Sequence, residues 1–364
     1  MSFVERAQRL GPQPFSVFMA WALYDEAAGF YAGGRGSAGR RGGDFLTAPE
    51  VGPLFGTVLA RAIDGWWRDL GSPDPFVVVE AGAGPGTLAR AVLAAGPECS
   101  TALRYVLVEA SSRQRERHAE HLPLEQAAFA FVPSDEESPL PQPSGRGPIA
   151  VSLGDLPRLA APCVVLANEL LDNLPFDLWE RRDGRWSAVL VDAGLGEVVV
   201  PLDPPGWLAG LEAPDGARVP VQEAARRWTL DALTLARPAE GGRLVLFDYC
   251  ATTADLARRP PDEWLRTYRS HQRGGPPLEA PGSQDITAEV CLDQLPAASA
   301  TTAQADWLRV HGIDELVEEG RAAWDQRASV GDLAAVRMRS RITEAEALLD
   351  PVGLGAFTVA EWHR

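Results

Sequence analysis

The segment from Phe76 to Leu88 constrains the fold more than any other part of the chain. It begins with four apolar residues, three of them valine, which predict a buried parallel strand. Glu80 ends that strand, glycines occupy alternate positions over Gly82–Gly86, and a helix-forming run starts at Leu88. Glycine has no Cβ, so a ligand can approach such a turn closely. The segment therefore predicts a strand, a tight turn and a helix that open onto a ligand.

The glycine spacing discriminates between two classes of cofactor. The dinucleotide-binding fingerprint needs its third glycine at the position of Thr87. The pattern G-x-G-x-G after an acidic residue instead favours S-adenosylmethionine (SAM) over NAD. A plain glycine-rich turn in an ordinary α/β protein is the alternative, because such motifs have false positives.

A second acidic residue supports a nucleotide site. Residues 104–109 predict the next strand, and Glu109 follows the glycine turn at about the distance where a carboxylate binds ribose hydroxyls. We therefore expect Glu80 to face the ammonium group of the cofactor and Glu109 its ribose. An exposed acid at a strand end is the alternative for Glu109.

Composition excludes several classes of protein. A net charge of −16 argues against nonspecific binding of nucleic acid. All 34 basic residues are arginine, which excludes a lysine Schiff base or a Walker-type lysine. The four cysteines and five histidines are scattered, so we expect no metal site. Without a long apolar run or a signal-peptide pattern, we expect a cytoplasmic protein that does not enter a membrane.

Further strands are predicted at 163–167 and 243–247, with a helix near 221–236. Alternating strands and helices predict a doubly wound α/β fold of Rossmann type. We expect residues 1–52 to form a helical extension with a loop over the cofactor. Residues 53–364 would form the SAM-binding domain, with insertions at about 174–220 and 251–300 as a lid or substrate subdomain.

Polar residues near predicted strand ends are candidates for the methyl acceptor site. They are Glu169 and Asp172 after the 163–167 strand, Asp285, and His271 nearby in sequence. A carboxylate pair suits a guanidinium, and Glu169 and Asp172 share a face if residues 169–174 are helical. The structural alternatives are a helix-terminal acid for Asp172 and a structural histidine for His271.

Several segments together resemble the MidA family of class I SAM-dependent methyltransferases. They are Phe15–Met19, Gly29–Tyr31, Gly43–Glu50, Glu80–Leu88, Asn168–Pro175 and Pro281–Thr287. The resemblance covers about residues 6–360, and its mitochondrial members assist complex I assembly by symmetric dimethylation of an arginine. It implies that residues 44–50 border the cofactor and that Asn168 and Glu169 line the acceptor pocket. Leu170 and Leu171 replace an aromatic pair that is usual in the family.

From these observations we predict N-methylation of a protein or peptide, with arginine implied by the resemblance. The alternatives are a SAM-binding assembly protein with little turnover, a methyltransferase of small molecules, and, less favoured, an NAD-dependent oxidoreductase. SAM is the expected cofactor and S-adenosylhomocysteine its product, and a homodimer is possible. The candidate cofactor-binding residues are Asp44, Thr47, Pro49, Glu50, Glu80, Gly82, Ala83, Gly84, Gly86, Thr87, Leu88, Glu109, Ala110, Gly154, Asp155, Leu156, Asn168 and Glu169.

Overall fold

The computed structural model describes residues 2–31, 47–127, 131–132, 142–143, 146–269, 272–327 and 333–364. None of the helices in these ranges is long and apolar enough to cross a membrane. The helices are α1 (Phe3–Leu10), α2 (Phe15–Tyr24), α3 (Ala48–Val51), α4 (Pro53–Asp69), α5 (Thr87–Ala94), α6 (Ser112–His121), α8 (Gly206–Ala209), α9 (Glu223–Ala236), α10 (Thr253–Leu256), α11 (Pro261–Trp264), α12 (Gln304–Val310), α13 (Ile313–Arg327) and α14 (Leu333–Leu348).

A seven-stranded sheet forms the centre of the molecule, and its order is β18-β19-β12-β7-β2-β3-β6. Neighbours from β12 to β6 pair in parallel, whereas β19 pairs antiparallel with both β12 and β18. The strands span β2 (Phe76–Ala81), β3 (Leu103–Val108), β6 (Ile149–Leu153), β7 (Val164–Asn168), β12 (Arg243–Asp248), β18 (Ala300–Ala303) and β19 (Thr358–Trp362). The doubly wound α/β fold predicted from the sequence is confirmed.

Successive side chains along each strand point to opposite faces of this sheet. Both faces are buried, because other elements pack against each of them. On one face, Val78 of β2 packs in a cluster with Phe55 of α4 and Trp307 of α12. On the other face, Val79 packs in a cluster with Ala232 of α9. The apolar run of β2, buried along its whole length, is explained by these two layers.

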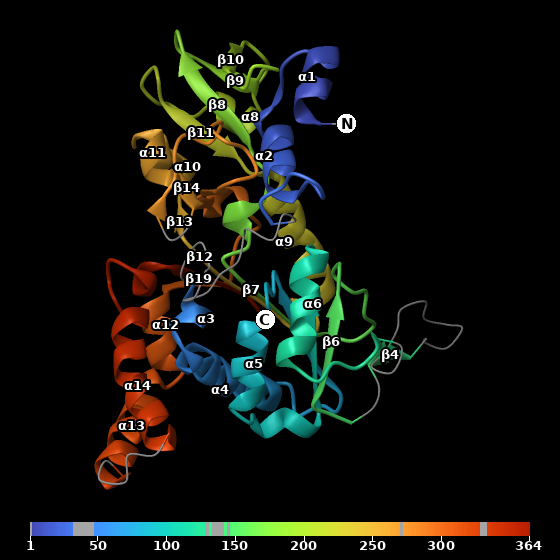
Figure 1. The fold of residues 1–364 in the computed structure, drawn as a ribbon, viewed down its shortest axis with the longest axis vertical. Coiled ribbons are helices and arrows are strands. Elements are labelled where there is room, and N and C mark those ends of the chain that lie inside the picture. The colour runs from blue at the N-terminus through green and yellow to red at the C-terminus, as the bar shows by residue number, and fades with distance from the viewer. Residues whose placement is uncertain are drawn as a thin grey trace.

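A second group of elements lies at one end of the molecule, opposite α13 and α14 (Figure 1). Its core joins Phe15 and Phe18 of α2 to Phe176, Trp264 and Ile286 from the two insertions. Its strands are β1 (Gln13–Pro14), β8 (Asp177–Arg182), β9 (Arg185–Val191), β10 (Glu197–Val200), β11 (Arg218–Val221), β13 (Cys250–Ala251), β14 (Leu265–Arg269), β15 (Gln272–Arg273), β16 (Asp285–Ala288) and β17 (Val290–Cys291). The short strands β4 (Phe131–Val132) and β5 (Gln142–Pro143) pair with each other and do not belong to this group.

The helical turn considered for residues 169–174 is wrong in its extent. Only Leu171–Asn173 forms a 3₁₀ turn, and Glu169 has a φ of 51°, in the left-handed region. Glu169 and Asp172 therefore do not share the face of one α-helix. A tight turn brings these two residues together instead.

Chain order along the sheet reverses between β2 and β7, since β3 and β6 lie on one side of this pair and β12 on the other. Open α/β sheets bind ligands outside the carboxyl ends of the strands at such a reversal. This edge also faces the second group of elements. The fold thus predicts a site where the central sheet meets the insertions.

Candidate functional site

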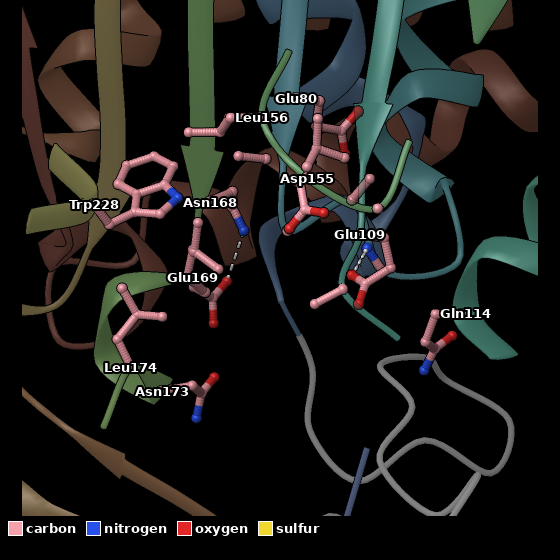
Figure 2. Close-up of a pocket in the computed structure, with 18 of the residues that line it drawn as sticks. Glu80, Glu109, Gln114, Asp155, Leu156, Asn168, Glu169, Asn173, Leu174 and Trp228 are labelled. Carbon is pink, nitrogen blue, oxygen red and sulfur yellow. Dashed lines mark hydrogen bonds between the residues drawn. The ribbon is translucent and has the colours of Figure 1, made fainter. Parts of the chain in front are cut away.

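A cavity of about 1000 Å³ opens at this edge of the sheet. Figure 2 shows side chains from several strand ends converging on it. The residues predicted to bind the cofactor that line it are Thr47, Pro49, Glu50, Glu80, Gly82, Ala83, Gly84, Thr87, Leu88, Glu109, Ala110, Gly154, Asp155, Leu156, Asn168 and Glu169. Asp44 and His271 lie outside the described residues.

Gly86 is the exception among the described candidates, because it does not line the cavity. It precedes α5 with a φ of 84°, and a Cβ there would lie 3.3 Å from both Leu107 and His118. Gly86 therefore lies on the side of the turn that packs against Leu107 and His118, and not on the side of the cavity. Gly84 is different, since a Cβ there would have no atom within 4 Å and would enter open space.

Glu109 is fixed by two backbone amides. Gly84 N donates to Oε2 at 3.0 Å, and Ser111 N donates to Oε1 at 2.7 Å. Burial raises the pKa of Glu109, and these two hydrogen bonds oppose that shift. The carboxylate is thus aligned before any ligand binds, with lone pairs left for ribose hydroxyls.

Glu80 is almost fully buried at the end of β2, and it accepts a hydrogen bond of 2.7 Å from Tyr105 Oη. Burial raises the pKa of Glu80 to about 8. A cationic ammonium group beside it would favour the ionised form. This is the group that the sequence predicts at Glu80.

Glu169 follows β7 and faces the same cavity (Figure 2). Its Oε1 accepts hydrogen bonds from Asn168 Nδ2 at 3.1 Å and from Ala48 N at 3.4 Å. Burial, and then the charge of Asp172, raises the pKa of Glu169 to about 8. A non-glycine residue in the left-handed region stores strain of a kind found at functional sites.

Three further carboxyl groups lie behind the cavity wall, and all are nearly inaccessible: Asp172, Asp248 and Asp285. Burial raises the pKa of each, and the charge of Asp172 adds to the shift at Asp285, whose pKa is about 7. Asp172 and Asp285, predicted as catalytic, do not line the cavity themselves.

Two tyrosines connect the N-terminal segment to this group. Tyr31 Oη donates to Asp285 Oδ1 at 2.9 Å, and Tyr24 Oη donates to the carbonyl oxygen of Asn173 at 2.9 Å. The two rings stack with centroids 5.6 Å apart, and both line the cavity. Asn173 Nδ2 also donates to Asp285, so Asp285 orients the residues of the wall.

Sequence reasoning missed one whole wall of the cavity. It is formed by α9 and the loop before β7, and its residues include Pro157, Arg158, Leu159, Trp228, Asp231, Thr234, Leu235 and Arg237. No motif marks these positions, and the 3.6-residue periodicity of α9 indicates only a packed helix. Gln114, Asn173 and Leu174 were also missed.

The donor and acceptor groups of the cavity fit the cofactor that the sequence predicts. Asn168 Oδ1 is buried without a hydrogen-bond partner among the described residues, so it can accept from an amino group. Glu80 can pair with an ammonium and Glu109 with ribose hydroxyls. The open space beside Gly84 leaves room for the ligand against the backbone.

The family Methyltransf_28, described as "Putative S-adenosyl-L-methionine-dependent methyltransferase", matches residues 58–311. The chain is 29% identical over 313 residues to "Protein arginine methyltransferase NDUFAF7 homolog, mitochondrial" of Drosophila melanogaster, which covers 77% of this chain and 65% of that protein. It thus spans slightly less than two thirds of the Drosophila protein. The Danio rerio protein of similar name is 28% identical over 335 residues, 85% of this chain and 75% of its own length.

Two solved structures from Burkholderia thailandensis share the fold. One is bound to S-adenosyl-homocysteine, with a TM-score of 0.76, 26% identity and coverage of 99% of this chain and 90% of that chain. The other is a native structure with a TM-score of 0.74, 25% identity and the same coverage. The similarity therefore extends over the insertions as well as the central sheet.

Proposed function

This chain belongs to the Methyltransf_28 family and is a SAM-dependent methyltransferase, and we propose that it methylates a cationic nitrogen, the guanidinium of a protein or peptide arginine. The observation that carries this proposal is the group of carboxyl residues Glu169, Asp172, Asp248 and Asp285 at one end of the cavity. The names of the Drosophila and Danio rerio relatives support the same acceptor.

The carboxyl groups suit a cationic acceptor for an electrostatic reason. Burial raises the pKa of Glu169 to about 8, so in the absence of a ligand its carboxyl group tends to hold a proton at neutral pH. A guanidinium at Glu169 would replace that proton by a charge-assisted hydrogen bond, the strongest kind that a planar fork can make. A neutral acceptor would gain little from this end of the cavity.

The cofactor end holds the methyl donor by the groups already described. Glu80, Glu109 and the glycine turn would bind its amino-acid and ribose parts, and Asp155 and Leu156 line the remainder of that end. SAM supplies a methyl group on a positively charged sulfur. The protein contributes the relative position of donor and acceptor.

Glu169 is the proposed catalytic residue, because it alone of the four carboxyl groups lines the cavity. It would align the acceptor nitrogen and take the proton that methylation releases. Asp172 and Asp285 act through their effect on Glu169 and on the wall residues Asn173 and Tyr31. His271 was predicted as a further candidate, and it lies outside the described residues.

The domain division predicted from the sequence forms part of this proposal. Thr47, Pro49 and Glu50 line the cavity, which supports a cofactor-covering role for the end of segment 1–52. Tyr24 and Tyr31 from the same segment line it near Asn173. The segment would thus border both ligands.

The experiment compares two peptides that differ only in charge. Labelled methyl transfer from SAM is measured to a set of arginine peptides and to the same peptides with citrulline, the neutral isostere of arginine. We expect transfer to arginine alone, with methylarginine recovered after hydrolysis. Equal transfer to both peptides would refute an arginine acceptor.

A further inference from the structure

The backbone of Gly84 is held on both sides. Its N–H donates to Glu109 Oε2 at 3.0 Å, and its carbonyl oxygen lies 2.8 Å from Nε2 of His118. The other ring nitrogen of His118, Nδ1, lies 2.8 Å from Ser152 Oγ on β6. A chain of polar contacts therefore connects β6, α6, the glycine turn and the carboxylate at the end of β3.

His118 is fully buried on α6, and it does not line the cavity. Its ring packs beneath the turn, since a Cβ at Gly86 would lie 3.3 Å from His118 Cδ2. The helix around it is strongly polar. A histidine that is buried without touching the ligand must act through what it contacts.

We propose that His118 is a positioning residue for the cofactor, a neutral imidazole that donates from Nε2 to the Gly84 carbonyl and thereby fixes the glycine turn against Glu109. The carbonyl oxygen can only accept, so Nε2 must carry the proton. Nδ1 is then the acceptor for the Ser152 hydroxyl. Burial lowers the pKa of His118, which favours this neutral form.

The physical consequence concerns the position of the Gly84 backbone. If the carbonyl lost its donor, the glycine turn could shift, because glycine has low barriers between its allowed regions. Such a shift would move the Gly84 N–H, which belongs to the preceding peptide, away from Glu109 and release the carboxylate that faces the ribose. Affinity for SAM and its product would fall although no residue that lines the cavity had changed.

Two substitutions separate the contacts of the ring. The amide nitrogen of glutamine can take the place of Nε2, so His118→Gln keeps a donor for Gly84. His118→Asn has a shorter side chain that can reach Ser152 only. Calorimetry with S-adenosylhomocysteine should show affinity within about 3-fold of the parent for Gln and a loss of about 10-fold for Asn. His121→Asn, on the same helix, is the control and should bind like the parent.

Equal affinities of the Gln and Asn variants would overturn the proposal, because a merely structural histidine would not distinguish the two contacts. A second measurement needs no variant and so avoids any failure to fold. Nitrogen NMR of histidine-labelled parent protein should show one ring with its proton on Nε2 and slow exchange. Observation of a proton on Nδ1 of His118, or free titration near its ordinary pKa, would also overturn it.

Discussion

The two ends of the cavity are built in different ways. The cofactor end is built mainly around one short segment, residues 80–88, together with Glu109, and backbone amides align its key carboxylate. The acceptor end gathers carboxyl groups from the turn after β7, the end of β12 and the start of β16. In our proposal, binding of the cofactor rests on local backbone geometry, whereas choice of acceptor would rest on side chains distant in sequence.

The largest expected effect tests the cofactor end. Gly84→Val would place a branched side chain in the open space of the cavity, and we expect no measurable SAM binding by calorimetry. Gly96→Val is the matched control, since Gly96 also has a positive φ and open space at its Cβ but does not line the cavity. Both variants should lose stability from backbone strain. Loss of SAM affinity in the Gly96 variant as well would remove the steric explanation.

The next effect tests the acceptor end. Glu169→Gln keeps the shape of the side chain and removes its charge, so methyl transfer should fall by about 10²-fold or more. Affinity for SAM should change little. Asp231→Asn, which alters a carboxylate on the α9 wall of the same cavity, should retain transfer. Undiminished transfer by the Glu169 variant would exclude this residue from the reaction.

A smaller effect is expected at Glu109. Its replacement by alanine removes the acceptor of two backbone amides and of the ribose, so binding should weaken by about 1–3 kcal/mol. SAM and S-adenosylhomocysteine carry the same ribose and should lose equal affinity. A loss for only one of the two ligands would place Glu109 at another part of the cofactor.

The smallest effect concerns stability and pH. Glu169 has a pKa of about 8 in the folded protein, above the ordinary value of a glutamic acid, so the folded state retains its proton to higher pH than the unfolded state. Its contribution to stability is therefore present at low pH and is lost as pH rises through about 8. Without ligand, the temperature midpoint of unfolding should decrease as the pH is raised from about 5 to about 8.5. Glu169→Gln should reduce this slope, and an unchanged slope would contradict the raised pKa.

The same contrast explains which parts the sequence could predict. The strand, the turn and Glu109 form a contiguous pattern with a fixed spacing, and the structure has them where the pattern predicts. Glu169 could be predicted as a site residue because it directly follows a buried strand. Asp248 directly follows the predicted strand at 243–247, but its proximity to Glu169 depends on strand order, which the sequence pattern does not encode.

Other site features had no signal in the sequence. Trp228 and Asp231 line the cavity because α9 packs against β7 and β12, and a helical pattern does not show which ligand a helix face meets. Gly86 belongs to the motif but supports the turn instead of facing the cavity. The role that we propose for His118 depends on a contact across two elements, α6 and the glycine turn.

The position of β19 has a consequence for the order in which the protein can be assembled. It follows every other described strand along the chain, yet it lies between β12 and β18 and pairs with both, for example Thr358 with Asp248 and with Ala303. Until β19 has been synthesised, β12 and β18 each present an unpaired edge to the cell. The partly made chain would therefore need protection from aggregation, although the strands of the cofactor end, β2 and β3, are complete long before.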